Sequence, residues 1–238
     1  MAGGYYTALS GMRARMNALD RVASDIANAS TAGFKPERAG TVEARRQQFN
    51  AALEAAVDVV NGRPRLDMRP GPMASTGRSL DIAIEGSGFL VVDTPRGLRY
   101  TRNGHLSRRG DGVLVGEDNA AVQGAQGPIR LGSGETAIDP DGTVRSGGAV
   151  VGKLRIVDFD PKAELFRDAG STFRTDATSR PVANPVVASG SLEQSNVSVV
   201  ERVAELSDVN QGFQALLKAV SVLMNDVDRG AINELGRR

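Results

Sequence analysis

The sequence has 238 residues, of which 40% are hydrophobic and 24% are charged. Its 29 basic and 28 acidic side chains leave a net charge of +1, which excludes a strong overall attraction to nucleic acid or to anionic lipid. Cysteine is absent, which excludes disulfides, zinc-thiolate sites and thiol nucleophiles, so stability must come from packing.

The N-terminal region lacks the basic segment, apolar run and cleavage site of a signal peptide. No stretch approaches the roughly 18 apolar residues that span a bilayer. We therefore expect no direct membrane insertion, and any export would have to use a route other than a cleaved leader.

In chain order, the first predicted element is an amphipathic helix at residues 1–28. Its apolar residues alternate between spacings of four and three and form one stripe: Tyr5, Leu9, Met12, Met16, Leu19, Ala23 and Ile26. The helix ends near Asn28, within SDIANASTAGFKPERAG, because Gly33 tolerates positive φ and Pro36 disfavours an α conformation at Lys35. Such a long, one-sided helix needs a partner.

A linker is expected at residues 29–74. A second helical pattern lies within it at residues 42–60, where Thr41 can cap the start and Asn61-Gly62 can close the end. The stretch GRPRLDMRPGPM that follows contains several prolines, which disfavour helix and predict an extended connector.

A β domain is predicted at residues 75–186. Leu80, Ile82 and Ile84 alternate with their neighbours, which is the pattern of a half-buried strand. Further strands are expected at residues 89–92, 98–101, 113–115 and 150–159. Between them lie dipeptides suited to tight turns between antiparallel strands: Asn103-Gly104, Asp111-Gly112 and Asp141-Gly142.

Residues 187–238 are predicted to hold a short linker and a second long helix. Ser198 can cap this helix and Glu201 can complete a capping box. The stripe that follows again has spacings of four and three: Val199, Val203, Leu206, Asn210, Phe213, Leu217, Val220, Met224 and Val227. Asn210 is its polar member, a residue type that sets register.

The predicted fold class is α+β. The N- and C-terminal amphipathic helices are expected to pair as a coiled-coil-like stem, with a mostly antiparallel β domain inserted between them. Because two helices alone leave much apolar surface exposed, we expect neighbouring copies or other chains to complete the stem. A core face that only covers the β domain is the alternative.

Motifs that could carry catalysis are weak. His105 follows an Asn-Gly turn without any thiol to activate, and the carboxylates form no acid/base pair. EGSGF lacks the dinucleotide fingerprint, DPDGT lacks the later acidic ligands of a calcium loop, and Arg102, Arg108 and Arg109 are interpreted as a solvated hairpin. We expect that the protein is not an enzyme and that it binds no cofactor, metal, nucleic acid or small-molecule substrate.

Several stretches resemble the axial proteins of the bacterial flagellum, the rod and hook proteins. NASTAGFK is similar to that family's N-terminal signature, SLDIAIEGSGFLVV, YTRNGHL and GVLV to the start of its β domain, and SLEQSNVSVVERVAELSDVNQGFQ to its C-terminal signature. Two positions depart from the family: Leu90 replaces a frequent second aromatic, and Gly212 replaces a longer, often charged side chain.

The resemblance implies a structural subunit of the basal-body rod, most like the proximal-rod protein, that polymerises through its end helices. It further implies a place in the periplasm, export by the flagellar type III apparatus, and other rod subunits as partners. A distal-rod or hook subunit, or a soluble monomeric binding module, remain alternatives. The predicted assembly interface consists of Leu9, Met12, Met16, Leu19, Ile26, Asn28, Gly33, Phe34, Val203, Leu206, Asn210, Phe213, Leu217, Val220, Met224 and Val227.

Overall fold

The computed structural model describes residues 2–38 and 65–235, and within the helices it describes the side chains of residues 11–27 and of 199–221 except 219. The described chain divides into two compact units. The helical unit holds residues 2–27, 37–38 and 198–235, and the β unit holds residues 28–36 and 65–197. The helix expected at residues 42–60 lies outside the described residues.

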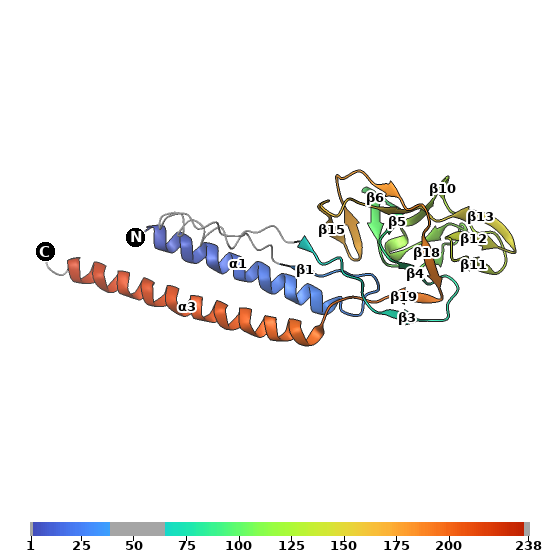
Figure 1. The fold of residues 1–238 in the computed structure, drawn as a ribbon. Coiled ribbons are helices and arrows are strands. Elements are labelled where there is room, and N and C mark those ends of the chain that lie inside the picture. The colour runs from blue at the N-terminus through green and yellow to red at the C-terminus, as the bar shows by residue number, and fades with distance from the viewer. Residues whose placement is uncertain (1, 39–64, 236–238) are drawn as a thin grey trace. The chain divides into compact units, whose positions relative to one another are not determined.

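The helical unit contains two long helices, α1 (Ala2–Ala27) and α3 (Val199–Leu235), which pack side by side (Figure 1). It also contains the short strand β1 (Glu37–Arg38). The predicted end of α1 near Asn28 is confirmed. The predicted cap of α3 is confirmed as well, since the backbone N–H of Glu201 donates to Oγ of Ser198 at 3.4 Å.

The β unit is built from short strands, and its described strand pairs are antiparallel, as expected. The strands are β2 (Arg65–Leu66), β3 (Met73–Ser75), β4 (Ile82–Glu85), β5 (Phe89–Thr94), β6 (Gly97–Thr101), β7 (Ser107–Arg108), β8 (Leu114–Val115), β9 (Ala121–Gly124), β10 (Gly127–Pro128), β11 (Thr136–Ile138), β12 (Thr143–Ser146), β13 (Ala149–Lys153), β14 (Ile156–Asp158), β15 (Phe166–Ala169), β16 (Thr172–Arg174), β17 (Arg180–Pro181), β18 (Val186–Ser189) and β19 (Ser191–Glu193). A short 3-10 turn, η2 (Glu117–Asn119), lies between β8 and β9.

The main sheet follows the order β15, β16, β6, β5, β9, β8, β7, with β14 also paired to β5. Strands β11, β12 and β13 form a separate three-stranded sheet, while β4 pairs with β18 and β3 pairs with β19. The last two pairs join strands that are far apart in sequence, so the C-terminal part of the β unit folds back onto its beginning.

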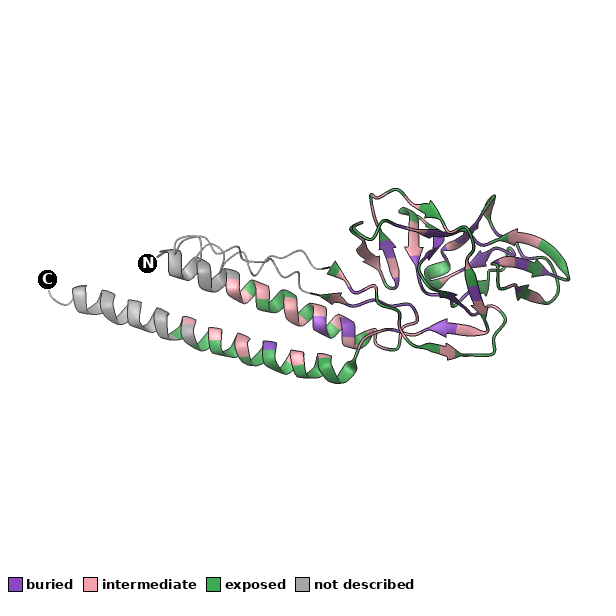
Figure 2. Ribbon diagram, in the orientation of Figure 1, coloured by how far each residue is buried: buried purple, intermediate pink, exposed green. Residues whose placement is uncertain are grey.

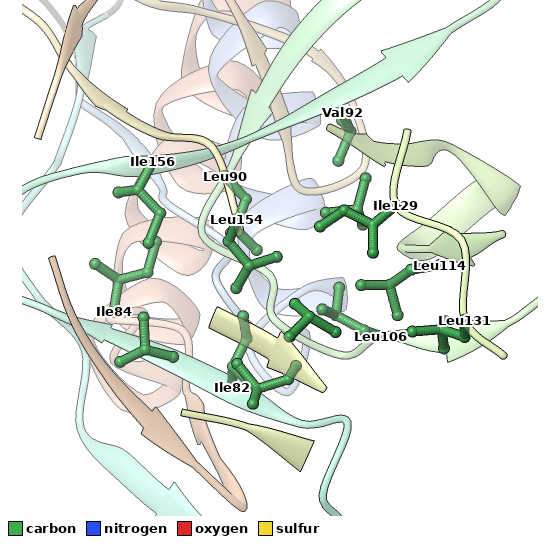
Figure 3. Close-up of a cluster of buried hydrophobic side chains, with 14 of the residues drawn as sticks. Ile82, Ile84, Leu90, Val92, Leu106, Leu114, Ile129, Leu131, Leu154 and Ile156 are labelled. Carbon is green, nitrogen blue, oxygen red and sulfur yellow. The ribbon is translucent and has the colours of Figure 1, made fainter. Parts of the chain in front are cut away.

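The core consists of two apolar clusters on opposite faces of β5. Leu90 and Val92 point into a large aliphatic cluster, part of which is shown in Figure 3. Phe89 and Val91 point the other way, into an aromatic cluster with Phe159 and Phe173. Since successive side chains of a strand alternate between faces, β5 is buried on both sides. Leu90, which departs from the family pattern, is 1% exposed in the aliphatic cluster.

Some sequence predictions for this unit were wrong in detail. The strand at residues 80–85 is not half-buried, because Asp81, Ala83 and their neighbours Ile82 and Ile84 are all buried. The strand predicted at residues 150–159 is divided into β13 and β14. Burial of both faces explains the first error, since neighbouring strands and loops cover the side that alternation assigned to solvent.

The turn predictions have mixed outcomes. Gly112 and Gly142 adopt φ angles of 83° and 82° in tight turns, as expected. Gly104 does not form a turn of this kind. A Cβ there would lie 1.8 Å from the carbonyl oxygen of Ile82, so this glycine allows two backbone segments to approach each other.

Candidate assembly interface

The helices α1 and α3 pack antiparallel and in step. Gly11 faces Leu216 and Arg15 faces Gly212, so four residues along α1 correspond to four residues back along α3. Farther along, Nε of Arg202 lies 3.6 Å from a carboxylate oxygen of Asp25, which extends the same register by ten residues on each helix.

The contacts that fix the register involve residues one position before members of the main apolar stripes, and on α3 they include Leu216, which widens the predicted stripe. They lie at residues 11, 15 and 25 of α1, where the stripe has Met12, Met16 and Ile26. On α3 they lie at residues 202, 212 and 216, where the stripe has Val203, Phe213 and Leu217. One residue corresponds to about 100° around a helix. The partner helix therefore covers an edge of each stripe and leaves part of it exposed.

Burial agrees with this displacement. On α3, Val209 is 8% exposed, while Val203 is 48% and Leu217 is 42% exposed. On α1, Val22 is fully buried, but Met16 is 53% exposed. Figure 2 shows exposed positions along much of the described part of α3. Large aliphatic side chains thus remain in contact with solvent beside a paired helix, which is typical of a surface that binds another protein.

The pair of Asp25 and Arg202 adds a charged contact between the helices. The Asp25 side chain is fully buried and the Arg202 side chain is 17% exposed. Arg202 also pairs with Glu205 on its own helix. A buried ion pair fixes register more than it adds stability, because desolvation opposes the Coulomb attraction.

After α1, the chain enters the β unit through the signature stretch. Thr31 donates its backbone N–H to the carbonyl of Asn28 at 3.0 Å, which closes a turn at the helix end. Gly33 has a φ angle of 66°, and a Cβ there would lie 2.3 Å from the backbone nitrogen of Asn103. Its backbone N–H donates to the carbonyl of Glu193 at 2.7 Å. Only glycine fits this position.

The next residue, Phe34, is 1% exposed. The guanidinium of Arg167 lies 4.3 Å from the centre of its ring, and the same side chain donates to the carbonyl of Lys35 at 2.6 Å. Phe34 therefore anchors the stretch inside the β unit.

Lys35 is at the centre of a buried cluster of charges. Its Nζ lies 2.5 Å from Oε1 of Glu193, and both side chains are 1% exposed. Arg102 lies 3.3 Å from the other oxygen of that carboxylate. Burial lowers the pKa of the Lys35 ammonium, although the carboxylate of Glu193 opposes this change.

Hydrogen bonds to the backbone surround this cluster. Lys35 also donates to the carbonyl of Arg69 at 2.7 Å, and Gly71 donates its N–H to Glu193 at 3.1 Å. Arg102 donates to the carbonyls of Ile84 and Gly86. Four segments that are far apart in sequence therefore meet at the cluster. They are residues 33–35, residues 69–71, residues 84–86 together with the Arg102 that bonds to them, and residue 193.

The structure locates the predicted interface residues in three groups. Met16, Val203, Asn210 and Leu217 are exposed. Half-buried members are Met12, Leu19, Ile26, Asn28, Leu206, Phe213 and Val220, whereas Gly33 and Phe34 are buried. The side chains of Leu9, Met224 and Val227 lie outside the described set. Burial gives Gly33 and Phe34 an internal packing role, and the contact with neighbouring subunits stays a prediction for the whole set.

Sequence reasoning missed Lys35, Glu193 and the role of Arg102. The interpretation of Arg102 as a solvated residue was wrong, since it is 8% exposed and bonded on several sides. Arg108 and Arg109 are exposed, and Arg109 pairs with Asp111. Hydrophobic periodicity contains no signal for a buried charge, so only the quoted signatures, which contain these residues, could have drawn attention to them.

Other candidate motifs are parts of turns and strand ends. His105 is exposed, and its Nδ1 lies 3.0 Å from Oδ1 of the buried Asp81. In DPDGT, Asp141 accepts from the N–H of Thr143 and from Lys153, while Asp139 pairs with Arg145. Among the described residues, no group of three or more acidic, histidine or cysteine side chains is placed to bind a metal. Nor is any described helix sufficiently long and apolar to traverse a membrane.

A cavity of about 460 Å³ opens beside the aromatic cluster, lined by Met68, Phe89, Arg102, Phe159 and Leu165 among others. The Arg102 guanidinium that borders it is already bonded to Glu193 and to two backbone carbonyls. The polar atoms of Arg102 therefore serve contacts within the protein itself.

Three family descriptions match consecutive parts of the chain. "Flagella basal body rod protein" matches residues 6–35, "Flagellar hook protein FlgE/F/G D1 domain" matches residues 83–146, and "Flagellar basal body rod FlgEFG protein C-terminal" matches residues 188–225. The first and last of these ranges contain Lys35 and Glu193, and the middle range contains Arg102.

Individual relatives match along their full length. The flagellar basal-body rod protein FlgF of Caulobacter vibrioides is 30% identical over an alignment that covers 100% of this chain and 99% of the relative. FlgF of Escherichia coli is 32% identical, with 97% of this chain and 96% of the relative covered. The flagellar basal-body rod protein FlgG of Bacillus subtilis is 28% identical, with coverages of 91% and 93%.

Proposed function

We propose, since the chain belongs to the family of flagellar basal-body rod proteins, that it assembles into the proximal rod through its terminal helices. It is a structural subunit of the flagellar basal body, and its partners are other flagellar axial subunits. Because the family consists of structural proteins, we assign it no enzymatic activity.

The observation that carries this proposal is the exposed apolar flank of the paired helices. Val199, Val203 and Leu217 of α3 are 46%, 48% and 42% exposed, and Met16 of α1 is 53% exposed. Desolvation of such side chains contributes about 25 cal/mol per Å² of apolar area removed from water. A neighbouring subunit that covers the flank would therefore be bound by the hydrophobic effect.

We expect the helices to act as a coiled-coil-like stem within this assembly. Parts of the stripes predicted from the sequence stay exposed beside the partner helix, and these parts are suited to contacts between subunits. A head-to-tail contact whose rotation does not close produces a helical filament, as a rod requires.

The finer points of location and export follow from the resemblance. We expect the subunit to cross into the periplasm through the flagellar type III apparatus. A direct check is to follow a tagged full-length chain in cells that lack this apparatus. The tagged protein should then stay in the cytoplasm.

Complementation of a deletion strain tests the function. Without the gene, we expect no motility and basal bodies that lack a complete proximal rod, whereas proximal rods that persist without a distal rod would favour the distal-rod alternative. Distal rods that persist without a hook would favour the hook alternative, and intact motile flagella would favour the soluble binding module.

A pair of substitutions tests the flank itself. Val203→Asp places a charge on the exposed flank and should abolish motility while the purified subunit keeps its helix content by circular dichroism. Gln211→Asp adds the same charge at an exposed polar position of α3 and should complement normally. Full motility of Val203→Asp would contradict the assigned surface.

A further inference from the structure

The buried cluster of Lys35, Glu193 and Arg102 occupies the place where the chain enters and leaves the β unit. Lys35 belongs to the segment that follows α1, and Glu193 to the segment that precedes α3. Gly33 and Glu193 are joined by a backbone hydrogen bond of 2.7 Å directly beside the ion pair. The two segments that lead to the stem helices are thus bonded to each other.

Charges are a costly way to stabilise this place. Lys35 and Glu193 are both 1% exposed, and two apolar clusters elsewhere already form the core. Apolar residues of similar volume are often as stable as a buried ion pair or more so. Apolar side chains, however, cannot make directional hydrogen bonds. Here the charged atoms select particular partners, such as the carbonyl of Arg69 and the N–H of Gly71.

We infer that the cluster of Lys35, Glu193 and Arg102 is a positioning device. It holds the segment after α1 and the segment before α3 in one fixed register within the β unit. This inference rests on the proposed function, because a subunit of a rod must present its helices to neighbours in a defined way.

The substitution Lys35→Met isolates this role. It removes the ion pair but leaves Glu193 paired with Arg102, so no net charge is stranded. The carbonyl of Arg69 still accepts a hydrogen bond from Nδ2 of Asn196 at 3.0 Å, and the carboxylate of Glu193 still accepts one from the N–H of Gly71. An unbranched apolar side chain of similar length fills the space.

Hydrogen exchange on the purified full-length chain gives a local readout. The amides of Gly33, Gly71 and Gln194 donate across the junction, whereas the amide of Leu114 donates to Ile129 inside the aliphatic cluster. In Lys35→Met we expect the junction amides to exchange at least about ten-fold faster, with little change at Leu114. Unchanged protection at the junction would overturn the inference.

Assembly in cells gives the second readout, with a matched control. Val144 is fully buried in the aliphatic cluster, away from the junction. Val144→Ala should therefore lower the stability of the protein without loosening the junction. We expect Lys35→Met to lose rod assembly. Val144→Ala should retain rod assembly, even if its melting temperature falls as far as that of Lys35→Met. The inference would be overturned if both variants assembled equally well. It would also be overturned if both failed to assemble while having the same melting temperature.

If Lys35→Met does not fold, Asn196→Ala loosens the same junction without touching a buried charge, since Asn196 donates to the carbonyls of Asp67 and Arg69. The same faster exchange and assembly loss are expected, and normal assembly despite faster exchange would contradict the positioning role. A motile deletion strain would instead refute the proposed function. The exchange measurement would still decide whether the cluster orders the junction.

Discussion

The guanidinium of Arg15 on α1 lies directly over Gly212 on α3. A Cβ added to this glycine would come within 3.1 Å of Cζ and 3.2 Å of Nη1 of the arginine. A glycine inside a helix is less stable than alanine by about 1 kcal/mol, so its presence needs a reason. A side chain at this position would require the Arg15 guanidinium, the end of a flexible side chain, to move aside.

A double-mutant cycle tests this relationship. Gly212→Leu should displace Arg15 and lower the stability of the helix pair by about 1 kcal/mol, despite the better helix propensity of leucine. In an Arg15→Ala background the same substitution should be neutral or stabilising. Thermal unfolding followed at 222 nm measures both, and additive effects of the two changes would show that the side chains are not coupled.

The ion pair of Asp25 and Arg202 leads to a second prediction. Arg202→Met removes the cationic partner of a fully buried carboxylate and should lower the stability of the helix pair by about 3 kcal/mol. Asp25→Leu combined with Arg202→Met should recover most of this loss. Arg13→Met, at an exposed position of α1, is the control and should change stability by no more than about 0.5 kcal/mol.

The close approach at Gly104 leads to a third prediction. A methyl group there would lie 1.8 Å from the carbonyl oxygen of Ile82, so Gly104→Ala must push β4 away and should destabilise the β unit by about 3 kcal/mol or more. Gly110→Ala is the matched control, because nothing lies within 4 Å of a Cβ at that position. Chemical denaturation should separate the two variants clearly, and similar midpoints would refute the backbone contact.

We expect the acid stability of the protein to depend in part on Asp141. The N–H of Thr143, the ammonium of Lys153 and the hydroxyl of Thr143 all bond to its carboxylate and lower its pKa from 3.8 to about 2. A carboxylate with a lowered pKa stabilises the folded state fully above its unfolded pKa, and this contribution disappears as the pH falls through the folded value.

Asp141→Asn should therefore be less stable than the parent chain at pH 6, and the difference should shrink between pH 4 and pH 2, a window set by the two pKa values. Melting temperatures of both chains across this range provide the measurement. A difference that stays constant down to pH 2 would show that the charge on Asp141 contributes nothing to the turn.

Local features of this protein follow from its sequence. The apolar spacing of four and three, the exit at Asn28 and the cap at Ser198 predicted two long helices, because these signals depend on neighbours within one or two turns. Gly112 and Gly142 marked turns for the same reason. The signature stretches identified the family, although they did not show what their buried residues do.

The tertiary structure decided which sides of these elements are covered. Sequence periodicity identified the stripe that contains Met16 and Val203, but the two helices also meet at neighbouring positions, where Gly11 faces Leu216 and Arg15 faces Gly212. Likewise, nothing near Lys35 in the chain indicates that Glu193, more than 150 residues away, will neutralise it. Periodicity measures how apolar a face is. Which face another segment covers, and which charges that segment brings, depends on contacts that form only when distant parts of the chain fold together.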